Sequence, residues 1–363
     1  MSNRSMSGLV VATGTGAPMR SQRPKPIHLL CGRAMTSYVL DSLDNAGVRQ
    51  GVVVTGAEGG RIAKRLLEDS PSFPLRFVEQ KQERGNGDAV LAGLSGFDDF
   101  EDDEDLLIVP GDLPLLRPEL LTELVTHHRE SGSACTVLAT MPHEEGVGEL
   151  IVRNRHGRVS AVASGTGSDK PQPGEGTVGP EAAVGVYCVR RGMVAPAVRR
   201  SATETRGPVP LSAMVSVLAE SGHHCDTLVV ENTPDLSPVD NRLQLAEAEA
   251  GLRRRTNERW LSMGVTLVDP DRTYIDATVS IGTDVTIFPG TILQGTTRIG
   301  DGCELGPDVR LDRCEVGRNT RIEKTTATLA TIGDDCVVGP FAVLAPGSTV
   351  SAGSVTGPFY AGG

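Results

Sequence analysis

The chain has 363 residues, of which 39% are hydrophobic, 22% are charged and only 3% are aromatic. This length suits two domains, and the balance is that of a globular protein whose cores are built from aliphatic and small side chains. The 35 basic and 46 acidic residues leave a net charge of −11. Such a charge argues against nucleic acid as a partner, because phosphate backbones are bound by clustered Lys and Arg.

The seven cysteines are scattered along the chain without a Cys-x-x-Cys pair. An odd, unclustered set indicates reduced thiols and argues against a zinc site. No apolar run approaches the roughly 18 residues that a membrane span requires, and no long apolar stretch precedes Arg20. We therefore expect a cytoplasmic protein with no membrane partner.

Strand and helix patterns alternate through the first 140 residues. Strands are predicted at 9–12, 51–54, 75–78 and 106–109, and helices at 34–46, 58–69 and from 88 onward. This alternation predicts an α/β, Rossmann-like domain with a mostly parallel sheet and helices on both faces. Glycine, serine and proline mark 164–180 as a loop, after which 182–189 is a further strand.

From Ile275 onward the aliphatic side chains recur with a period of six, with one five-residue step from Leu311 to Val316. They are Ile275, Ile281, Ile287, Leu293, Ile299, Leu305, Leu311, Val316, Ile322, Ile332, Val338, Leu344 and Val350, with an irregular stretch after Ile322. Each hexapeptide predicts one short strand and a turn, and three of them close one turn of a left-handed parallel β-helix with an aliphatic interior. About four triangular turns fit this segment, and no capping sequence follows them.

These patterns divide the chain into three parts. We predict an α/β domain at 1–239, a linker helix at 240–263 that contains the single tryptophan, Trp260, and a short β-helix domain at 264–363.

A glycine loop follows the first predicted strand. It reads Val11-Ala12-Thr13-Gly14-Thr15-Gly16-Ala17-Pro18-Met19, and Pro24-Lys25 come soon after. Such a loop lets backbone N–H groups approach a polyphosphate, and a nearby lysine supplies a compact positive charge. The same residues are also compatible with an ordinary turn.

The loop, its distance to Pro24-Lys25 and the following Ile27-His28 resemble the start of the bifunctional UDP-N-acetylglucosamine pyrophosphorylase / glucosamine-1-phosphate N-acetyltransferase family. That family reads Leu-Ala-Ala-Gly-x-Gly-Thr-Arg-Met and then Pro-Lys. Later matches are Gln80 with Gly85-Asn86-Gly87-Asp88-Ala89, Gly111-Asp112-Leu113-Pro114-Leu115, Gly146-Val147-Gly148 and Val239-Asp240-Asn241-Arg242-Leu243. The resemblance spans almost the whole chain, which looks like a divergent, C-terminally truncated member.

The resemblance implies roles for these positions. The nucleotide would lie on Val11, Ala12, Thr13, Gly14 and Gly16, with Gln80, Gly85 and Asn86 reading the uracil and Gly111 and Gly148 lining the sugar site. Lys25 and Asp112 would be catalytic, and Mg²⁺ would be held by Asp112 and Asp240. Mg²⁺ typically takes one or two carboxylates plus phosphate oxygens and water. Asp112 is otherwise a loop-capping residue, and Asp240 is equally an N-cap of the helix that follows.

Several family residues are replaced. Ala17-Pro18 stand where the family has Thr-Arg, so the arginine that would meet the leaving pyrophosphate is absent, and Arg20 or Arg23 is a candidate substitute. Ser164 aligns with a sugar-binding Glu and Ala183 with a sugar-binding Asn. A pocket without these two side chains would recognise N-acetylglucosamine less well.

The acetyltransferase half of the pattern is also altered. The family's acetyl-transfer site lies on later coils and uses a histidine base, whereas no histidine follows His224 here. Val343 and Ala345 replace arginines in the stretch 339–347. We predict that acetyl transfer is absent, because no general base is available. The adjacent pairs His127-His128 and His223-His224 are expected on surfaces, and His28 packed.

The leading hypothesis is a Mg²⁺-dependent nucleotidyltransferase that joins UTP or another NTP to a sugar 1-phosphate and releases pyrophosphate. One alternative is a catalytically degenerate nucleotide-binding or scaffold protein, and another is an enzyme for an unusual sugar in secondary metabolism. Hexapeptide coils pack through flat faces, and the resemblance implies a homotrimer.

Overall fold

The computed structural model describes residues 4–69, 72–82, 84–97, 104–141, 148–164, 177–204, 207–231 and 234–362. It divides into two compact units. One comprises Met1–His28 and Ala34–Gln244, and the other comprises Leu29–Arg33 and Leu245–Gly363. None of the described helices is both long and apolar enough to cross a membrane.

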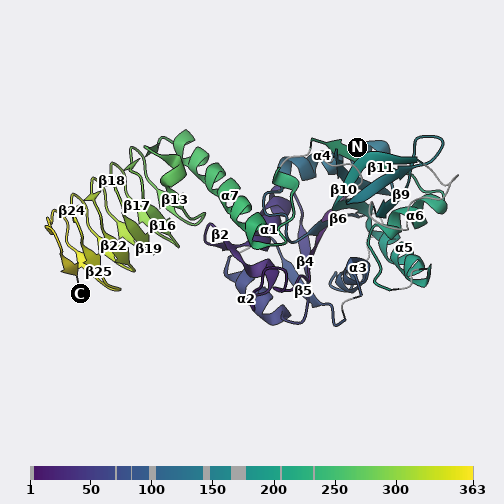
Figure 1. Ribbon diagram of the computed structural model, residues 1–363, viewed down its shortest axis with the longest axis horizontal. Coiled ribbons are helices and arrows are strands. Elements are labelled where there is room, and N and C mark those ends of the chain that lie inside the picture. The colour runs from purple at the N-terminus through teal and green to yellow at the C-terminus, as the bar shows by residue number, and fades with distance from the viewer. Residues whose placement is uncertain are drawn as a thin grey trace. The chain divides into compact units, whose positions relative to one another are not determined.

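The first unit is built on one mixed sheet (Figure 1). Its main strand order is β11-β7-β10-β6-β1-β4-β5, with β8 and β9 joined through β10. β1, β4, β5 and β6 run parallel to one another, whereas β10 is antiparallel to both β6 and β7. The strands are β1 (Met6–Ala12), β4 (Gln50–Thr55), β5 (Leu75–Glu79), β6 (Asp105–Pro110), β7 (Cys135–Thr140), β8 (Glu149–Arg153), β9 (Val159–Ser164), β10 (Thr177–Arg190) and β11 (Cys225–Val230).

Helices cover both faces of this sheet, as the strand–helix alternation predicts. Leu9 and Val10 are adjacent in β1 and belong to different cores, because successive strand side chains point to opposite faces. One core receives α1 (Met35–Asn45), α2 (Gly59–Glu68) and α4 (Pro118–Ser131). The other receives α3 (Asn86–Leu94), α5 (Arg191–Glu204) and α6 (Ala213–Glu220). The short pieces are η1 (Lys25–Ile27), η2 (Pro234–Leu236), β2 (Leu29–Leu30) and β3 (Arg33–Ala34).

The loop predicted at 164–180 is shorter than expected. β10 already begins at Thr177, where Thr177 and Val178 pair with Arg153 and Val152 of β8. Cross-strand pairing in the sheet therefore overrides the local Gly and Pro composition. Residues 165–176 of that prediction lie outside the described ranges.

The expectation that both histidine pairs are exposed is wrong for one residue. His223 and His224 are exposed, but His128 is fully buried on the inner side of α4. Its Nδ1 lies 2.9 Å from Thr136 Oγ1 and its Nε2 lies 3.7 Å from Asp105 Oδ1. Adjacent residues on a helix face different directions, so His127 remains partly exposed while His128 enters the core.

Burial of His128 makes the unit acid-sensitive. Burial, reinforced by three nearby arginines, lowers the pKa of His128 to about 4 against the attraction of Asp105. The folded state thus binds this proton less readily than the unfolded chain, and stability is lost as pH falls from about 6.5 toward 4. We expect this group to remove about 2 kcal/mol of unfolding free energy between pH 7.5 and 5. Urea denaturation at both pH values measures this decrease in unfolding free energy. We expect the decrease to be smaller in His128→Gln than in wild type and unchanged in His223→Gln. Equal pH dependence of all three proteins would contradict the assignment.

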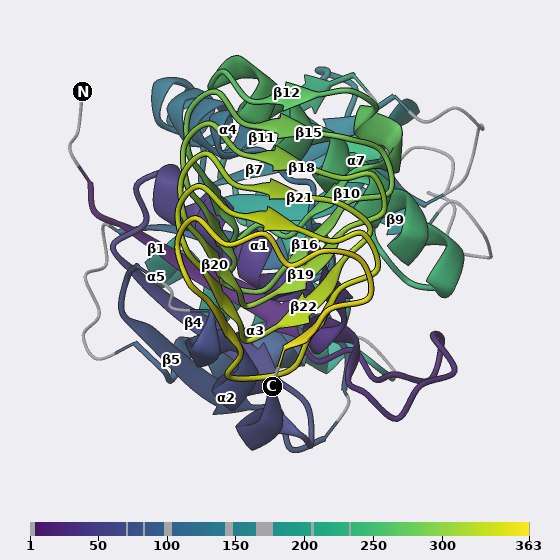
Figure 2. The ribbon, with the colours of Figure 1, turned by 90° about the vertical axis from the view of Figure 1, so that its left-hand side faces the viewer.

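The second unit is the predicted left-handed parallel β-helix, which follows α7 (Arg242–Ser262) and carries η3 (Pro270–Arg272) between its first two strands. Figure 2 shows strands of successive turns stacked in parallel along each side. One sheet contains β12 (Thr266–Leu267), β15 (Thr286–Ile287), β18 (Glu304–Leu305), β21 (Arg321–Ile322) and β24 (Val337–Val338). A second contains β13 (Tyr274–Ile275), β16 (Ile292–Gln294), β19 (Arg310–Asp312), β22 (Thr326–Thr328), β25 (Val343–Leu344) and β27 (Ala361–Gly362). The third contains β14 (Ser280–Ile281), β17 (Arg298–Ile299), β20 (Glu315–Val316), β23 (Thr331–Ile332) and β26 (Thr349–Val350).

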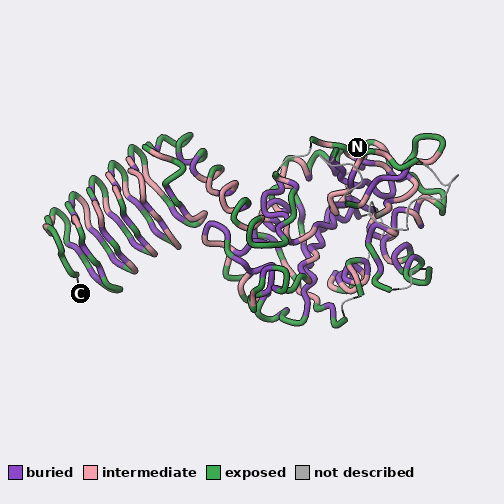
Figure 3. The backbone as a smooth tube through the Cα atoms, viewed as in Figure 1, coloured by how far each residue is buried: buried purple, intermediate pink, exposed green. Residues whose placement is uncertain are grey.

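The irregular stretch after Ile322 is a regular part of the coil. Ala327 on β22 is fully buried and stacks between Leu311 and Leu344 in its sheet. The aliphatic steps from Ile322 to Ala327 and from Ala327 to Ile332 are five residues each. The inward position is therefore kept by a small side chain that a search for large aliphatics overlooks. Figure 3 shows buried residues recurring in successive turns of the coil, alternating with exposed and intermediate ones.

Candidate active site

The opening glycine loop leaves β1 at the carboxyl edge of the sheet, where ligands of parallel α/β sheets collect. After Gly16 the chain turns back on itself, since Met19 N and Ser21 N both donate to Gly16 O, at 3.1 and 3.0 Å. A Cβ at Gly16 would lie closer than 3.0 Å to the carbonyl oxygens of Ser21 and Arg23. Only glycine fits this turn. The predicted loop residues Val11, Ala12, Thr13 and Gly14 precede it directly.

We expect Gly16→Ala to displace this turn, because the clash is with backbone atoms on both sides. A shift of about 1 Å at a nucleotide loop costs on the order of a hundredfold in kcat/KM. Gly60→Ala is the matched control, since nothing lies within 4 Å of a Cβ at that position in α2. Steady-state kinetics of the two variants measure the loss of kcat/KM. Equal values in Gly16→Ala and Gly60→Ala would contradict the expected displacement of the turn.

Lys25 joins the loop to two carboxylates from distant parts of the chain. It lies at the start of η1, is buried, and passes beneath the loop so that a Cβ on Gly14 would lie 3.1 Å from Lys25 Cδ. Its Nζ donates to Asp112 Oδ2 at 2.6 Å and to Asp240 Oδ1 at 2.5 Å. The predicted catalytic pair and the second predicted metal ligand are thus brought together at one point.

The charges at this point favour an additional cation. Burial alone would lower the pKa of Lys25, but the charges of Asp112 and Asp240 and the hydrogen bonds to them outweigh burial and raise it. The ammonium is therefore held in its charged form. The ammonium offsets one of the two negative charges, and Asp112 Oδ1 is buried with no hydrogen-bond partner among the described residues. An unpartnered carboxylate oxygen beside excess negative charge is an acceptor for a cation.

The alternative role of Asp240 as a helix N-cap is wrong. α7 begins at Arg242, and the cap is Asn241, whose Oδ1 accepts from Gln244 N at 3.0 Å. Gln244 Oε1 accepts in return from Asn241 N at 3.1 Å, which is a reciprocal capping box. The Asp240 carboxylate is left to face Lys25, and its segment is fixed by a hydrogen bond from Val239 N to Asp112 O at 2.9 Å.

The predicted base-reading residues follow β5 along the same edge. Gln80 is buried, and its Nε2 donates to Gly85 O at 3.0 Å and to Asp88 Oδ2 at 2.9 Å. Gly85 has a φ of 95°, a conformation that favours glycine. Asn86 uses its Oδ1 to accept from Leu211 N at 2.7 Å, so this side chain anchors the neighbouring loop.

The predicted sugar-side positions lie further along the edge. Gly111 is buried after β6 and its N donates to Val11 O at 2.9 Å, whereas Gly148 is exposed just before β8. Gly146 and Val147 of the same motif lie outside the described residues. In the sheet Glu149 stands between Ser164 and Ala183, the two positions at which the family's sugar-binding residues are replaced.

Two further residues were not singled out by the sequence. Glu149 places a carboxylate between those replaced positions, and its Oε1 accepts from Ser212 Oγ at 2.7 Å. Arg242 holds the glycine loop through a 3.2 Å hydrogen bond from its Nε to Met19 O. The signal for Arg242 was its place in the 239–243 motif. Glu149 carried no signal until the strands were paired.

Neither candidate for the missing arginine is held in place. Arg20 and Arg23 flank the turn after Pro18 and are both exposed, and neither guanidinium has a hydrogen-bond or ion-pair partner in the part of the chain that is described. His28 is packed, as expected, and burial lowers its pKa.

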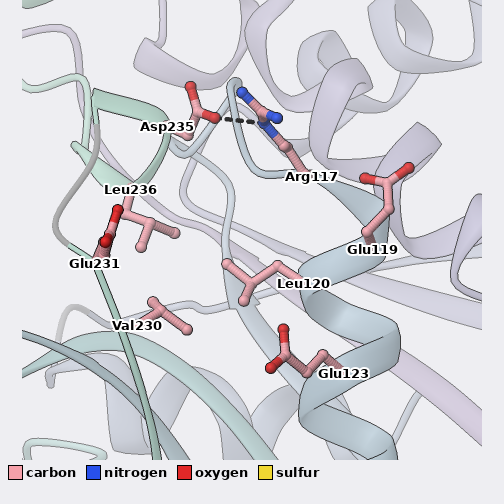
Figure 4. Close-up of a pocket in the computed structure, with 8 residues that line it drawn as sticks. All are labelled: Arg117, Glu119, Leu120, Glu123, Val230, Glu231, Asp235 and Leu236. Atoms are coloured by element: carbon pink, nitrogen blue, oxygen red, sulfur yellow. Dashed lines mark hydrogen bonds and ion pairs between the residues drawn. The ribbon is translucent and has the colours of Figure 1, made fainter.

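A separate recess of about 360 Å³ lies between the start of α4, the end of β11 and η2 (Figure 4). Leu120, Val230 and Leu236 form its apolar wall, and Glu119, Glu123 and Glu231 give it an acidic rim. Arg117 also lines the recess, and its guanidinium forms an ion pair with Asp235 at 2.5 Å. This recess contains none of the predicted site residues and repels a phosphate.

A glycine loop, a buried lysine and two carboxylates at the carboxyl edge of an α/β sheet are the arrangement expected of a nucleotidyltransferase. The family of MobA-like NTP transferase domains matches residues 8–172. The bifunctional protein GlmU of Streptomyces avermitilis is 34% identical over 353 residues, which cover 97% of this chain and 72% of that protein. GlmU of Heliobacterium modesticaldum is 32% identical (97% and 75% covered), and that of Mycobacterium bovis BCG is 35% identical (97% and 70% covered). This chain belongs to the GlmU family.

Proposed function

We propose that the protein is a Mg²⁺-dependent sugar-1-phosphate nucleotidyltransferase that forms an NDP-sugar and pyrophosphate. The observation that carries this proposal is the junction of Lys25, Asp112 and Asp240 beside the glycine loop. In the reaction a sugar-phosphate oxygen bonds to the α-phosphorus of the NTP, and the bond from that phosphorus to the β-phosphate oxygen breaks. Such transfers depend on positioning and charge neutralisation and need no covalent enzyme intermediate.

The residues present fit a Mg²⁺ ion. Asp112 offers its unpartnered Oδ1, and Asp240 offers a half-exposed carboxylate. Within the described ranges no group of three or more His, Cys, Asp or Glu is arranged to hold a metal, so the remaining ligands would be phosphate oxygens and water, as is usual for this ion. When bound, Mg²⁺ neutralises phosphate charge. A cation held by Asp112 and Asp240 would compete with Lys25 for the two carboxylates, so that the Lys25 ammonium would be able to face a phosphate oxygen.

UTP is the nucleotide we favour. Gln80 donates its amide hydrogens to Gly85 and Asp88, which orients the amide and presents its Oε1 as an acceptor. Uracil offers an N3–H donor, whereas the same ring position of cytosine is an acceptor. A fixed acceptor therefore discriminates between the two bases.

The sugar is less constrained than the nucleotide. Ala183 provides no polar group, and Glu149 is the carboxylate nearest to it in the strand register. Ala183→Asn restores the side chain that the resemblance assigns to this position. We expect it to raise kcat/KM for N-acetylglucosamine 1-phosphate about tenfold, the value of one added hydrogen bond to a substrate. An unchanged or lower value, with glucose 1-phosphate as the reference substrate, would mean that the natural sugar is a different one.

The direct test is pyrophosphate release by the full chain with Mg²⁺ across a panel of NTPs and sugar 1-phosphates. Turnover with at least one pair supports the proposal. The competing function, a nucleotide-binding or scaffold protein, is favoured by Ala17-Pro18 and the unanchored Arg20 and Arg23. Tight calorimetric binding of an NTP without turnover of any pair would establish that alternative.

We also propose that the coil of this chain carries no acetyl transfer. From Thr266 onward no histidine is present to act as base, and Val343 and Ala345 occupy the positions of two family arginines. An assay of thiol release from acetyl-CoA with glucosamine 1-phosphate should give no rate above background. A rate proportional to protein concentration would overturn this.

A homotrimer is proposed from the surface of the coil. Val343, Phe341 and Phe359 are more than half exposed, and the two phenyl rings stack at 5.3 Å. Adjacent exposed apolar side chains typically mark contacts between proteins. Light scattering at micromolar concentration should give three times the chain mass, and a monomeric mass would refute the assembly.

A further inference from the structure

The amino edge of the first unit's sheet contains a recess of about 210 Å³ that the nucleotidyl-transfer site does not use. Arg4, Arg49 and Arg129 line it together with Thr122 and Thr126 of α4. Arg4 precedes β1 and Arg49 precedes β4, so the recess lies at the edge of the sheet opposite to that of Asp112. We name it the arginine recess.

The arginine recess has an excess of positive charge. No acidic residue is among the described residues that line it. Behind it, Asp105 lies 3.5 Å from Arg4 Nη1 and 2.7 Å from Arg129 Nε, with its carboxylate fully buried. Among the described contacts, three guanidiniums therefore face this one carboxylate. The excess stands out in a chain whose overall net charge is −11, and concentrated charge of one sign in a recess attracts counter-ions.

The guanidinium of one of the three arginines has no hydrogen-bond or ion-pair partner in the described ranges. Arg129 is fixed by Asp105 and by a 2.9 Å hydrogen bond from its Nη2 to Arg4 O. Arg49, by contrast, forms no hydrogen bond or ion pair through its guanidinium there. Its backbone is nevertheless fixed, because Arg49 N donates to Met6 O at 3.1 Å. The recess thus combines a preset guanidinium with one whose donors are available.

We propose that the arginine recess binds a phosphate-bearing dianion, either free phosphate or a small phosphate monoester. Guanidinium groups bind phosphate oxygens through paired, charge-assisted hydrogen bonds, and three of them lining one recess suit a doubly charged anion. The walls are predominantly polar groups of α4 and of the strand starts, so an apolar ligand has little surface to cover.

The test is calorimetric titration of the full chain with inorganic phosphate at constant chloride ionic strength. Arg49→Ala removes the guanidinium whose donors are available in the arginine recess. Arg158→Ala removes an exposed arginine in the β8–β9 turn, whose guanidinium likewise has no partner in the described ranges. Lys25→Ala removes the cation of the nucleotidyl-transfer site at the opposite edge. We expect wild type and Arg158→Ala to bind phosphate alike and Arg49→Ala to bind about tenfold more weakly, while the Lys25→Ala titration reports any phosphate bound at the nucleotidyl-transfer site.

Arg49→Lys provides an independent variant, which keeps the charge but loses the planar fork and should bind with intermediate affinity. Repeating the titration with glycerol phosphate distinguishes the sources, because tighter binding of the monoester assigns an organic phosphate and tighter binding of the free ion assigns phosphate itself. The proposal is overturned if neither anion binds, if Arg49→Ala and Arg158→Ala titrate alike, or if only Lys25→Ala abolishes binding.

Discussion

Asp112→Asn is expected to lower the rate of nucleotidyl transfer by on the order of a hundred- to a thousandfold while leaving the fold intact. The change keeps the side chain's volume but removes the negative charge that faces Lys25 and the proposed cation. It also replaces one carboxylate oxygen by an amide nitrogen, which cannot ligate a metal. Pyrophosphate release under saturating substrates measures kcat, and thermal unfolding monitors the fold.

Asp240→Asn is the comparison for that variant. Asp240 is half-exposed and its amide equivalent still offers one oxygen, so we expect a loss of only a few-fold at saturating Mg²⁺. A larger loss of activity in Asp112→Asn than in Asp240→Asn indicates that the Asp112 carboxylate holds the metal. A carboxylate that only contributes negative charge near Lys25 would not produce this difference. Equal losses in both variants, or full activity of Asp112→Asn, would contradict the role assigned to Asp112.

The largest expected loss of stability comes from the buried pair of Glu104 and Arg191. Glu104 accepts from Arg191 Nη1 and from Ser7 Oγ, and all three residues are buried. Arg191 also stacks over Phe97 at 4.6 Å. Glu104→Gln leaves the guanidinium buried without its counter-charge, which costs about 3–5 kcal/mol of unfolding free energy.

Urea denaturation of Glu104→Gln measures that cost. Glu220→Gln is the matched control, because Glu220 pairs with Arg200 at 2.6 Å with both side chains about half exposed. Solvent screens such pairs, so we expect the control to lose less than about 1 kcal/mol. A similar loss in the two variants would show that burial is not what makes the first pair important.

The fold was largely predictable from periodicity. Strand and helix alternation located β1, β4, β5 and β6, and the six-residue period located nearly every inward position of the coil. What failed depended on distant partners. Ala327 is too small to register as a core aliphatic, Thr177 becomes a strand residue only through β8, and His128 is buried only because α4 packs on the sheet.

The sequence allowed single residues of the site to be predicted, but not how their side chains lie relative to one another. Motifs pointed to Gly16, Lys25 and Asp112, since each follows or precedes a strand end. Nothing in the sequence decided whether Asp240 caps a helix or faces Lys25, because Asn241 beside it is an equally good cap. Lys25 and Asp240 are 215 residues apart in the sequence, and the fold brings their side chains into contact. This contact shows that the Asp240 carboxylate faces Lys25. The same holds for Glu149, which strand pairing alone places beside Ala183.

We propose that one cation, held by Asp112 and Asp240, contacts a polyphosphate that lies on the opening glycine loop. Crystals grown with a non-hydrolysable UTP analogue and Mn²⁺ test it most directly, because manganese is located by its anomalous scattering. We expect one peak about 2.1 Å from Asp112 Oδ1, with the phosphates against Gly14 and Gly16 and with Lys25 turned from the carboxylates to a phosphate oxygen. Manganese bound away from Asp112, or a nucleotide bound away from the loop, would contradict it.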